Sequence, residues 1–417
     1  MKERNNIIIS FLLSLLFTLL FFFPSASWSQ LAIGQYEDEA PFRTWNTLGI
    51  KTASSLARGE TQFTLASDCS VALSNPALLT KLPKITYTLN YSSSRALFYK
   101  YSLVNTGVLF SEKSLSHDFS GFDFLGMSVR LNNWAFGLSW ALIENYGRPL
   151  ASFEYGPQDA LYYSINFDQQ GKLNNLNFSI SSEFFEGVSL GFGFNYVYGR
   201  LDKDLTEEWV ADGVTITDTK SSDYKGYYFN GGLTLDLAES FRVAAVFRTP
   251  YIKKSKSQSM LRYESVTGRT DISIDAASDD EFHQPLVVGL GARFIIFENV
   301  KVISEFALYK WSDYKVDYFG ESLQRDFKDV VKIGIGAEYE NSIELFNQVF
   351  YLPWRAGFSY DPQPMKEPSS SYIYYTIGSG IRWKKLLFDA AFIFGQERGS
   401  GDALSASKVA FSLSYHF

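Results

Sequence analysis

The chain has 417 residues and a formal net charge of −7, with 37 Phe, 26 Tyr and 8 Trp but a single cysteine, Cys69. The negative charge argues against a nucleic-acid partner, and one cysteine excludes internal disulfides. Only one apolar run approaches the length of a membrane-spanning helix, which excludes a helical membrane protein with several spans. Many aromatic residues without long apolar runs are typical of a transmembrane barrel, whose strands turn alternate residues toward lipid.

The N-terminus has the pattern of a secretory signal peptide. Two basic residues precede an apolar run from Ile7 to Phe23, Pro24 ends the run, and small residues follow. A retained membrane helix is the alternative, because about 20 apolar residues span a bilayer. The proline and the small residues fit a processing site better than a stop-transfer flank. We therefore expect residues 1–29 to be a cleaved signal peptide.

The next segment, residues 30–82, is predicted to be a plug inside the barrel. It lacks sustained alternation and is rich in Ala, Ser, Thr and Leu. A barrel of about fourteen strands encloses more space than side chains alone can fill. Gly, Ser, Ala and Asn dominate the positions expected to face inward, which leaves room for a folded insert.

Residues 83–417 alternate apolar and polar residues with period two, the pattern of β-strands. In 187–199 one face is apolar and largely aromatic, while small or polar residues occupy the other; the apolar face comprises Val188, Leu190, Phe192, Phe194, Tyr196 and Tyr198. Segments 133–144 and 330–340 behave alike. A soluble sandwich also alternates, but its faces are rarely this aromatic. We predict an all-β fold, a transmembrane antiparallel barrel.

Short turns and long polar segments succeed one another along the barrel. The short turns are predicted at 131–133, 184–187, 237–240, 297–299 and 383–385, with a longer connection of the same series at 340–349. The long segments are 94–120, 146–172, 201–223, 253–283, 312–326, 361–370 and 396–407. Short turns on one side and long loops on the other are expected of outer-membrane barrels. The count is about fourteen strands, with 98–110 assigned to the first external loop because a strand there would break the even number.

The chain ends in a strand that alternates up to a terminal aromatic residue, with Tyr415 and Phe417 on one face and His416 on the other. Such an ending resembles the signal read by the bacterial barrel-assembly machinery, which we expect as a partner during insertion. His416 is expected to face the lumen near the periplasmic rim. We predict a monomer in the outer membrane of a Gram-negative-type bacterium, in contact with lipid and lipopolysaccharide.

Several motifs resemble those of one family of outer-membrane transporters. Residues 74–91 (SNPALLTKLPKITYTLNY) resemble the junction between plug and first strand in the long-chain fatty-acid and aromatic-hydrocarbon transporters, the FadL/TodX family. The plug of that family ends in Asn-Pro-Ala, here Asn75, Pro76 and Ala77, with an Asp upstream, here Asp68. Further matches, in the same order, are ENYG at 144–147, YVYGR at 196–200, FRTPY at 247–251, YKWSDY at 309–314 and FKDVVKIGIGAEY at 327–339.

The resemblance implies uptake of long-chain fatty acids or similar apolar molecules by passive diffusion, gated by the plug. In the family a kinked third strand is thought to open the wall sideways. Asn145, Tyr146 and Gly147 are the matching candidates for that kink, since Gly weakens strand pairing and permits a bend. The alternative is that Gly147 only starts the external loop. In the plug motif, Pro76 fixes its backbone and Asn75 can cap local backbone groups, which would anchor the plug.

A carboxylate headgroup would require basic partners. The family's pocket uses basic residues, and the matching positions here are Arg200 and Lys328, each of which is more simply a solvated charge at the rim. The cluster Lys253, Lys254 and Lys256 could meet lipopolysaccharide phosphates, although a solvated face is the simpler interpretation.

No enzyme is predicted, because the three histidines are not placed with a serine and an acid in a convincing array. No cofactor and no metal are expected either; residues 277–283 are acidic but lack the ligand spacing of a calcium loop. Two other functions stay open. One is a structural or partner-binding barrel, such as a secretion-associated shuttle. The other is a general porin, against which the expected plug and the small residues of the lumen argue.

Overall fold

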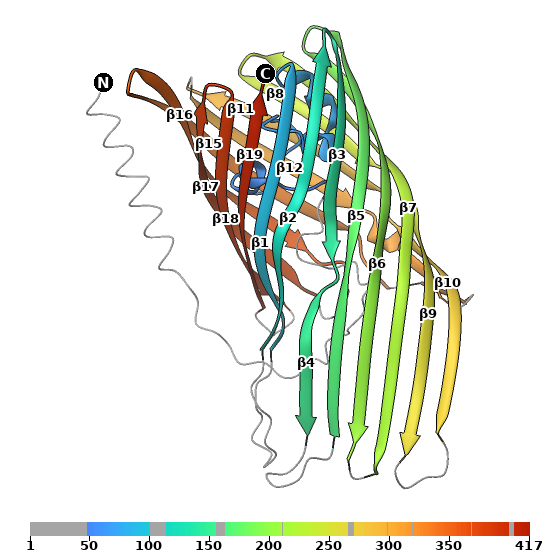
Figure 1. Cartoon of the computed structure of the whole chain (residues 1–417). Coiled ribbons are helices and arrows are strands. Elements are labelled where there is room, and N and C mark those ends of the chain that lie inside the picture. Colours follow the sequence, from blue (N-terminus) through green and yellow to red (C-terminus); the bar gives the residue numbers. More distant parts are fainter. Residues whose placement is uncertain are drawn as a thin grey trace.

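The computed structural model describes residues 48–100, 114–155, 163–210, 212–265, 271–297, 299–318, 321–324, 326–367, 369–399 and 404–417. The expected signal peptide, residues 1–29, and the first part of the expected plug, residues 30–47, lie outside these ranges. The described chain forms a closed ring of antiparallel strands with a short segment inside it (Figure 1).

Fourteen strands follow one another around the ring, which confirms the predicted strand number. They are β1 (Ile85–Lys100), β2 (Ser114–Leu131), β3 (Trp134–Asn145), β5 (Tyr163–Phe185), β6 (Val188–Trp209), β7 (Val214–Ala238), β8 (Phe241–Arg248), β11 (Val287–Ile296), β12 (Val300–Tyr309), β15 (Val330–Leu345), β16 (Gln348–Pro362), β17 (Ser371–Trp383), β18 (Leu386–Arg398) and β19 (Ser405–His416). The ring closes where β1 pairs with β19, with Thr86 opposite His416.

Five further strands lengthen the wall on one side of the ring. They are β4 (Arg148–Tyr155), β9 (Tyr251–Ser265), β10 (Ile272–Gln284), β13 (Lys315–Tyr318) and β14 (Glu321–Gln324). Together with the part of β5 that pairs with β4, the part of β7 that pairs with β9, and the length of β6 between them, they form what we call the extension, toward the bottom of Figure 1. Most of the polar segments 146–172, 201–223 and 253–283, which we expected to be loops, are therefore strands. Their backbone groups are satisfied by ladders, which do not require apolar residues on both faces.

The two faces of the ring differ as the alternation predicted. In β6, Phe192 and Phe194 point outward and are 56% and 43% exposed, whereas Ser189 and Asn195 point inward and are fully buried. The same division holds in β18 and β19, where Phe388, Phe392, Phe411 and Leu413 are exposed while Asp389, Ser412 and Ser414 are buried. The ring thus presents an apolar outer surface around a polar, small-residue interior.

Residues 48–82 lie inside the ring, and we call them the plug segment. Their helices are short: α2 (Ala53–Leu56), α3 (Val71–Ser74) and the 3-10 helix η1 (Pro76–Lys81). A second 3-10 helix, η2 (Trp311–Asp313), connects β12 to β13. None of the helices in the described ranges is long and apolar enough to cross a membrane. Almost every residue of the plug segment is buried, because its apolar side chains pack against small and apolar residues of the wall.

Candidate functional site

The wall is interrupted where the sequence predicted a kink. β3 ends at Asn145, β4 begins at Arg148, and Tyr146 and Gly147 lie between them. The chain bends there without leaving its neighbour, because Tyr146 N donates to the carbonyl oxygen of Gly171 on β5 at 2.9 Å. Gly171 has a φ of +144°, and a Cβ at this position would lie 2.2 Å from the carbonyl oxygen of Arg200, so only glycine fits.

On the other side of the bend, the ladder between β2 and β3 stops, and β4 continues beside β2. Among the described residues their ladder runs only from Phe124 opposite Ala141 to Leu131 opposite Trp134. β2 itself continues to Ser114 against β1, and β4 pairs with β5. A β-bulge at Asp123 in β2 marks the point where the pairing stops. The bend and the bulge together leave the edges of β2 and β4 facing each other in the wall, with no described ladder between them.

Tyr146 turns into the lumen and joins an aromatic cage around Lys253. The Lys253 ammonium donates to the Tyr146 hydroxyl at 3.1 Å and lies 4.6 Å from the ring centre of Tyr224 and 4.9 Å from that of Phe282. Aromatic faces attract a cation and offset part of its burial. A larger apolar cluster of the lumen surrounds this cage, and its bulky members include Leu173, Leu201, Tyr228, Tyr309, Trp311 and Tyr314.

The Asn-Pro-Ala motif holds the plug segment against β6 and β7. Asn75 Nδ2 donates to the carbonyl oxygen of Phe63 at 2.6 Å and to the Thr234 hydroxyl of β7 at 3.1 Å. Its Oδ1 accepts from Ala77 N at 3.1 Å, which caps η1, and Pro76 occupies the first turn of that helix, where a missing N–H costs nothing. The motif thus caps a helix and links the plug segment to the wall.

Buried ion pairs hold the other end of the plug segment. Arg58, fully buried, donates to Glu338 of β15 at 2.8 Å. Glu338 also accepts from Arg355 of β16 at 2.7 Å and from Lys301 of β12 at 2.7 Å, and Arg355 continues to Asp389 of β18 at 2.5 Å. A buried charge is tolerated when it is paired and hydrogen-bonded on several sides. Four strands and the plug segment therefore share one electrostatic network.

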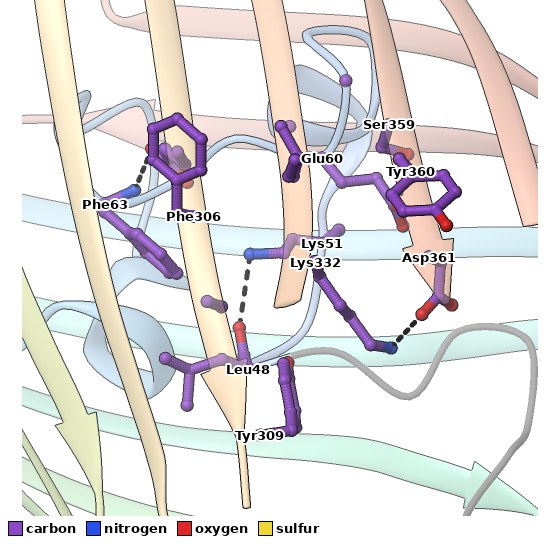
Figure 2. A pocket seen from close by; sticks show the side chains of 15 residues that line it. Leu48, Lys51, Glu60, Phe63, Phe306, Tyr309, Lys332, Ser359, Tyr360 and Asp361 are labelled. Carbon is purple, nitrogen blue, oxygen red and sulfur yellow. Dashed lines mark hydrogen bonds and ion pairs between the residues drawn. The ribbon is translucent and has the colours of Figure 1, made fainter. Parts of the chain in front are cut away.

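A small chamber of about 50 Å³ remains between the plug segment and strands β12, β15 and β16. Figure 2 shows its mixed lining of apolar and charged side chains, in which Lys332 pairs with Asp361 at 2.7 Å and Lys51 donates to the carbonyl oxygen of Leu48 at 3.2 Å. Burial and the nearby Asp361 carboxylate raise the pKa of Glu60. The volume suits one or two waters, so this chamber cannot hold an apolar ligand.

The other predicted residues lie apart from this lumen. Arg200 is on the outward face of β6, where it pairs with Asp202 at 2.9 Å, and Lys328 donates to Ser369 at 2.6 Å. The structure does not bring the two together, and their role toward a headgroup stays a prediction. Tyr415 and Phe417 pack edge to face at 4.8 Å, and Phe417 N donates to the carbonyl oxygen of Ile85, where the ring closes.

Sequence reasoning missed two features of the site. Lys253 was grouped with Lys254 and Lys256 as a surface cluster, but it is 5% exposed inside the lumen, while its neighbour Lys254 points outward to Glu281. The period-two pattern of Lys253, Ser255 and Ser257 is the signal that would have placed it inside. The Arg58–Glu338 pair joins residues 280 apart in sequence, and no local pattern indicates such a pair.

Three potential metal ligands, Glu281, His283 and Asp317, meet on the outer side of β10 and β13. His283 Nε2 lies 2.8 Å from Asp317 Oδ2, and Lys254 and Lys315 approach the two carboxylates to 2.8 and 3.5 Å. These cations already neutralise the acids, so the cluster is explained as an ion-pair network between the two strands.

Comparisons with known proteins agree with this architecture. The model of the BamG family matches residues 52–381. A FadL homologue of Pseudomonas aeruginosa superposes with a TM-score of 0.65 at 15% identity, covering 89% of this chain and 99% of that one. The toluene transporter TodX of Pseudomonas putida gives 0.62 at 17% identity, with 89% and 99% covered. The monoaromatic hydrocarbon channel CymD gives 0.64 at 15%, with 90% and 100% covered. No curated protein matches the sequence. The fold is thus that of the FadL/TodX channels.

Proposed function

The chain belongs to the BamG family, and from its fold and lumen we propose that it is an outer-membrane channel for apolar small molecules, closed by the plug segment. The apolar outer face of the ring suits lipid contact, and the closing strand with its terminal Phe417 suits insertion by the barrel-assembly machinery. The neighbours named as toluene and monoaromatic hydrocarbon channels support apolar cargo.

One observation carries the proposal: the wall is interrupted beside an aromatic lumen. The bend at Tyr146 and Gly147 and the short ladder between β2 and β3 leave strand edges that can separate. The aromatic cage lies on the inner side of that interruption. An apolar molecule would pass from the lumen to the bilayer core there, without entering water.

The lining suits molecules with a long apolar part and at most one anionic group. Each buried CH₂ contributes about 0.8 kcal/mol, so a fatty acyl chain binds with few polar contacts. Lys253, at the centre of the cage, is the cation best placed for a carboxylate inside the lumen. Arg200, which points outward, and Lys328 would meet the headgroup earlier, at the outer rim.

The plug segment closes the conduit, so transport requires it to move. A disulfide between Ala72→Cys in α3 and Gly137→Cys in β3 tests this, in a Cys69→Ala background that removes the native thiol. A Cβ at Gly137 would lie 3.6 Å from the Ala72 Cβ, within the range of about 3.5–4.5 Å that a disulfide spans. Uptake of radiolabelled palmitate is measured in Gram-negative cells whose own fatty-acid channel is deleted.

We expect the oxidised double-cysteine variant to take up no more palmitate than cells without the protein, and reduction to restore uptake. The two single-cysteine variants are the controls and should transport under both conditions. Equal uptake by the oxidised and reduced double variant would refute movement of the plug segment. Absence of uptake by the unmodified protein, for palmitate and for toluene alike, would refute the channel.

A second candidate function is that of a structural or partner-binding barrel. The BamG family match suggests a link with barrel assembly, and the buried network around Glu338 fixes the plug segment firmly. If the protein has that function, the disulfide between positions 72 and 137 would leave partner binding intact. A general porin finds less support, because the plug segment fills the lumen.

A further inference from the structure

The extension carries its apolar side chains on the face of the wall opposite to that of the ring. Near the short turns, apolar side chains of β6 point outward, but in the extension the apolar residues of four strands take the inward register. They are Trp209, Val214, Ile216, Leu261, Tyr263, Ile272 and Ile274, which we call the apolar patch. The register makes them neighbours, since Ile216 is opposite Tyr263, Tyr263 opposite Ile272, and Leu261 opposite Ile274.

The patch is open on its inner side. Trp209, Leu261, Ile272 and Ile274 are between 43% and 54% exposed. The opposite face of the same strands carries, apart from Met260, mainly polar residues, including Thr215, Thr217, Arg262, Glu264, Ser273 and Asp275. An amphipathic sheet that stands in water is stable when something covers its apolar face. The polar outer face shows that this part of the wall stands above the lipid, so lipid does not cover it.

A polar collar separates the patch from the lumen. Buried Ser222, Ser255 and Ser257 are joined by hydrogen bonds of 2.8 and 2.9 Å, and buried Asp280 and Lys220 lie at neighbouring positions of the inner face. An apolar ligand would have to cross this collar to reach the aromatic cage. The patch is therefore a surface distinct from the conduit.

Two carboxylates give the patch a charge. Glu207 is opposite Ile216 and Asp218 is opposite Leu261, both on the inward register and both half-buried. Within the described ranges neither side chain has a hydrogen bond or an ion pair. A covering surface that is apolar and carries Lys or Arg would satisfy both the patch and its acids.

We propose that the patch docks a protein partner on the cell surface, whose contact face combines apolar side chains with basic ones. A second copy in the same membrane would meet the outward face of the wall, not its inner one. The patch covers four strands about 4.8 Å apart and three alternate positions along them, roughly 200 Å². A stable contact buries about 800 Å² per partner, so the patch is the apolar centre of a larger interface.

Photo-cross-linking in living cells tests the proposal with a matched pair of positions. p-Benzoylphenylalanine replaces Ile274, in the patch, or Ser273, the adjacent residue on the opposite face. We expect a protein adduct of defined mass at 274 and none at 273, accessible to protease added outside the cells. Glu207→Lys combined with Asp218→Lys should lower the 274 adduct by about tenfold or more, because it replaces attraction by repulsion.

Native electrophoresis of gently extracted membranes gives a second measurement. Leu261→Asp with Ile274→Asp should reduce the protein from a complex to the mass of the single chain, whereas Ser273→Asp should not. Heat-modifiable migration verifies that each variant is folded, and palmitate uptake should be unchanged because the collar separates the patch from the conduit. An adduct at 274 that joins only lipid or this chain itself, or no adduct, would overturn the proposal, as would an unaltered adduct after charge reversal.

Discussion

At the scale of single residues, glycines set how closely the plug segment approaches the wall. A Cβ at Gly191 of β6 would lie 2.4 Å from backbone atoms of Pro76 and Ala77, and one at Gly232 of β7 would lie 1.9 Å from the Asn75 side chain. Small residues at inward positions are expected to leave room for an insert. The contacts give the reason position by position, since any side chain at these two glycines would push the motif away.

Gly191→Ala is therefore expected to destabilise the folded protein by about 1–3 kcal/mol, the usual cost of overpacking. Gly121→Ala is the control, because its Cβ would meet its nearest neighbour, the Phe119 ring, at 3.4 Å, an ordinary contact. The temperature at which the heat-modifiable band disappears from gels measures the difference. Equal temperatures for the two variants would contradict a close contact between motif and wall.

Substitution of the two buried arginines is expected to lower the free energy of unfolding by unequal amounts. Arg355→Met leaves both Glu338 and Asp389 without their shared cation, and we expect it to cost about 3–5 kcal/mol of unfolding free energy. Arg58→Met removes one of three cations from Glu338, and it also removes the cost of burying Arg58, so its effect should be smaller. Denaturant unfolding followed by tryptophan fluorescence compares them, and a larger loss from Arg58→Met would refute the assignment.

At the scale of elements, period-two alternation predicted the strands of the ring, because lipid outside and a polar lumen inside impose opposite residue types. It did not predict the strands of the extension, where the outer face is polar and the inner face changes from the polar collar to the apolar patch. The plug motif and the bend came from the resemblance to one family, and the residues fall at a helix cap and at a break between strands. The aromatic cage was missed because its members come from β7, β9, β10 and the bend, distant in sequence.

The small hairpin of β13 and β14 should respond to acid. Hydrogen bonds from Ser322 and His283 lower the pKa of Asp317, which links β13 to β10. A depressed folded pKa means that the carboxylate stabilises the hairpin above its unfolded pKa of about 3.9 and ceases to do so as the pH falls through the lower folded value. Hydrogen exchange in 315–324, corrected for intrinsic rates, should accelerate below about pH 4. Asp317→Asn should exchange fast throughout, and β8 is the unaffected reference.

At the scale of the whole molecule, the chain is a closed ring with a tall wall on one side only. β5, β6 and β7 have 23, 22 and 25 residues, about twice the 9–11 that a strand needs to cross a membrane. The ring closes without the extension, because the closing ladders lie among β1, β2, β18 and β19. The ring and the apolar patch at the end of the extension are thus separate parts of one sheet, and the aromatic cage lies between them.

Replacement of residues 203–220 by a short Asn-Gly turn tests this division. We expect the shortened protein to insert, to remain heat-modifiable and to take up palmitate, while the adduct at position 274 disappears with the inner face that supports it. Whole-cell uptake and gel migration are the measurements, with the full-length chain as the control. Failure to form a folded band would contradict the independence of the ring from the extension.

The closure of β1 against β19 also encloses the plug segment. The plug segment precedes β1 in the chain, and the last ladder joins Thr86 to His416, contacts of very long sequence separation that form slowly because of their loop entropy. When β19 completes the ring, the wall encircles the plug segment, and the buried contacts of 48–82 hold it there. A segment that precedes β1 in the chain is thus enclosed by a ring that the last strand closes.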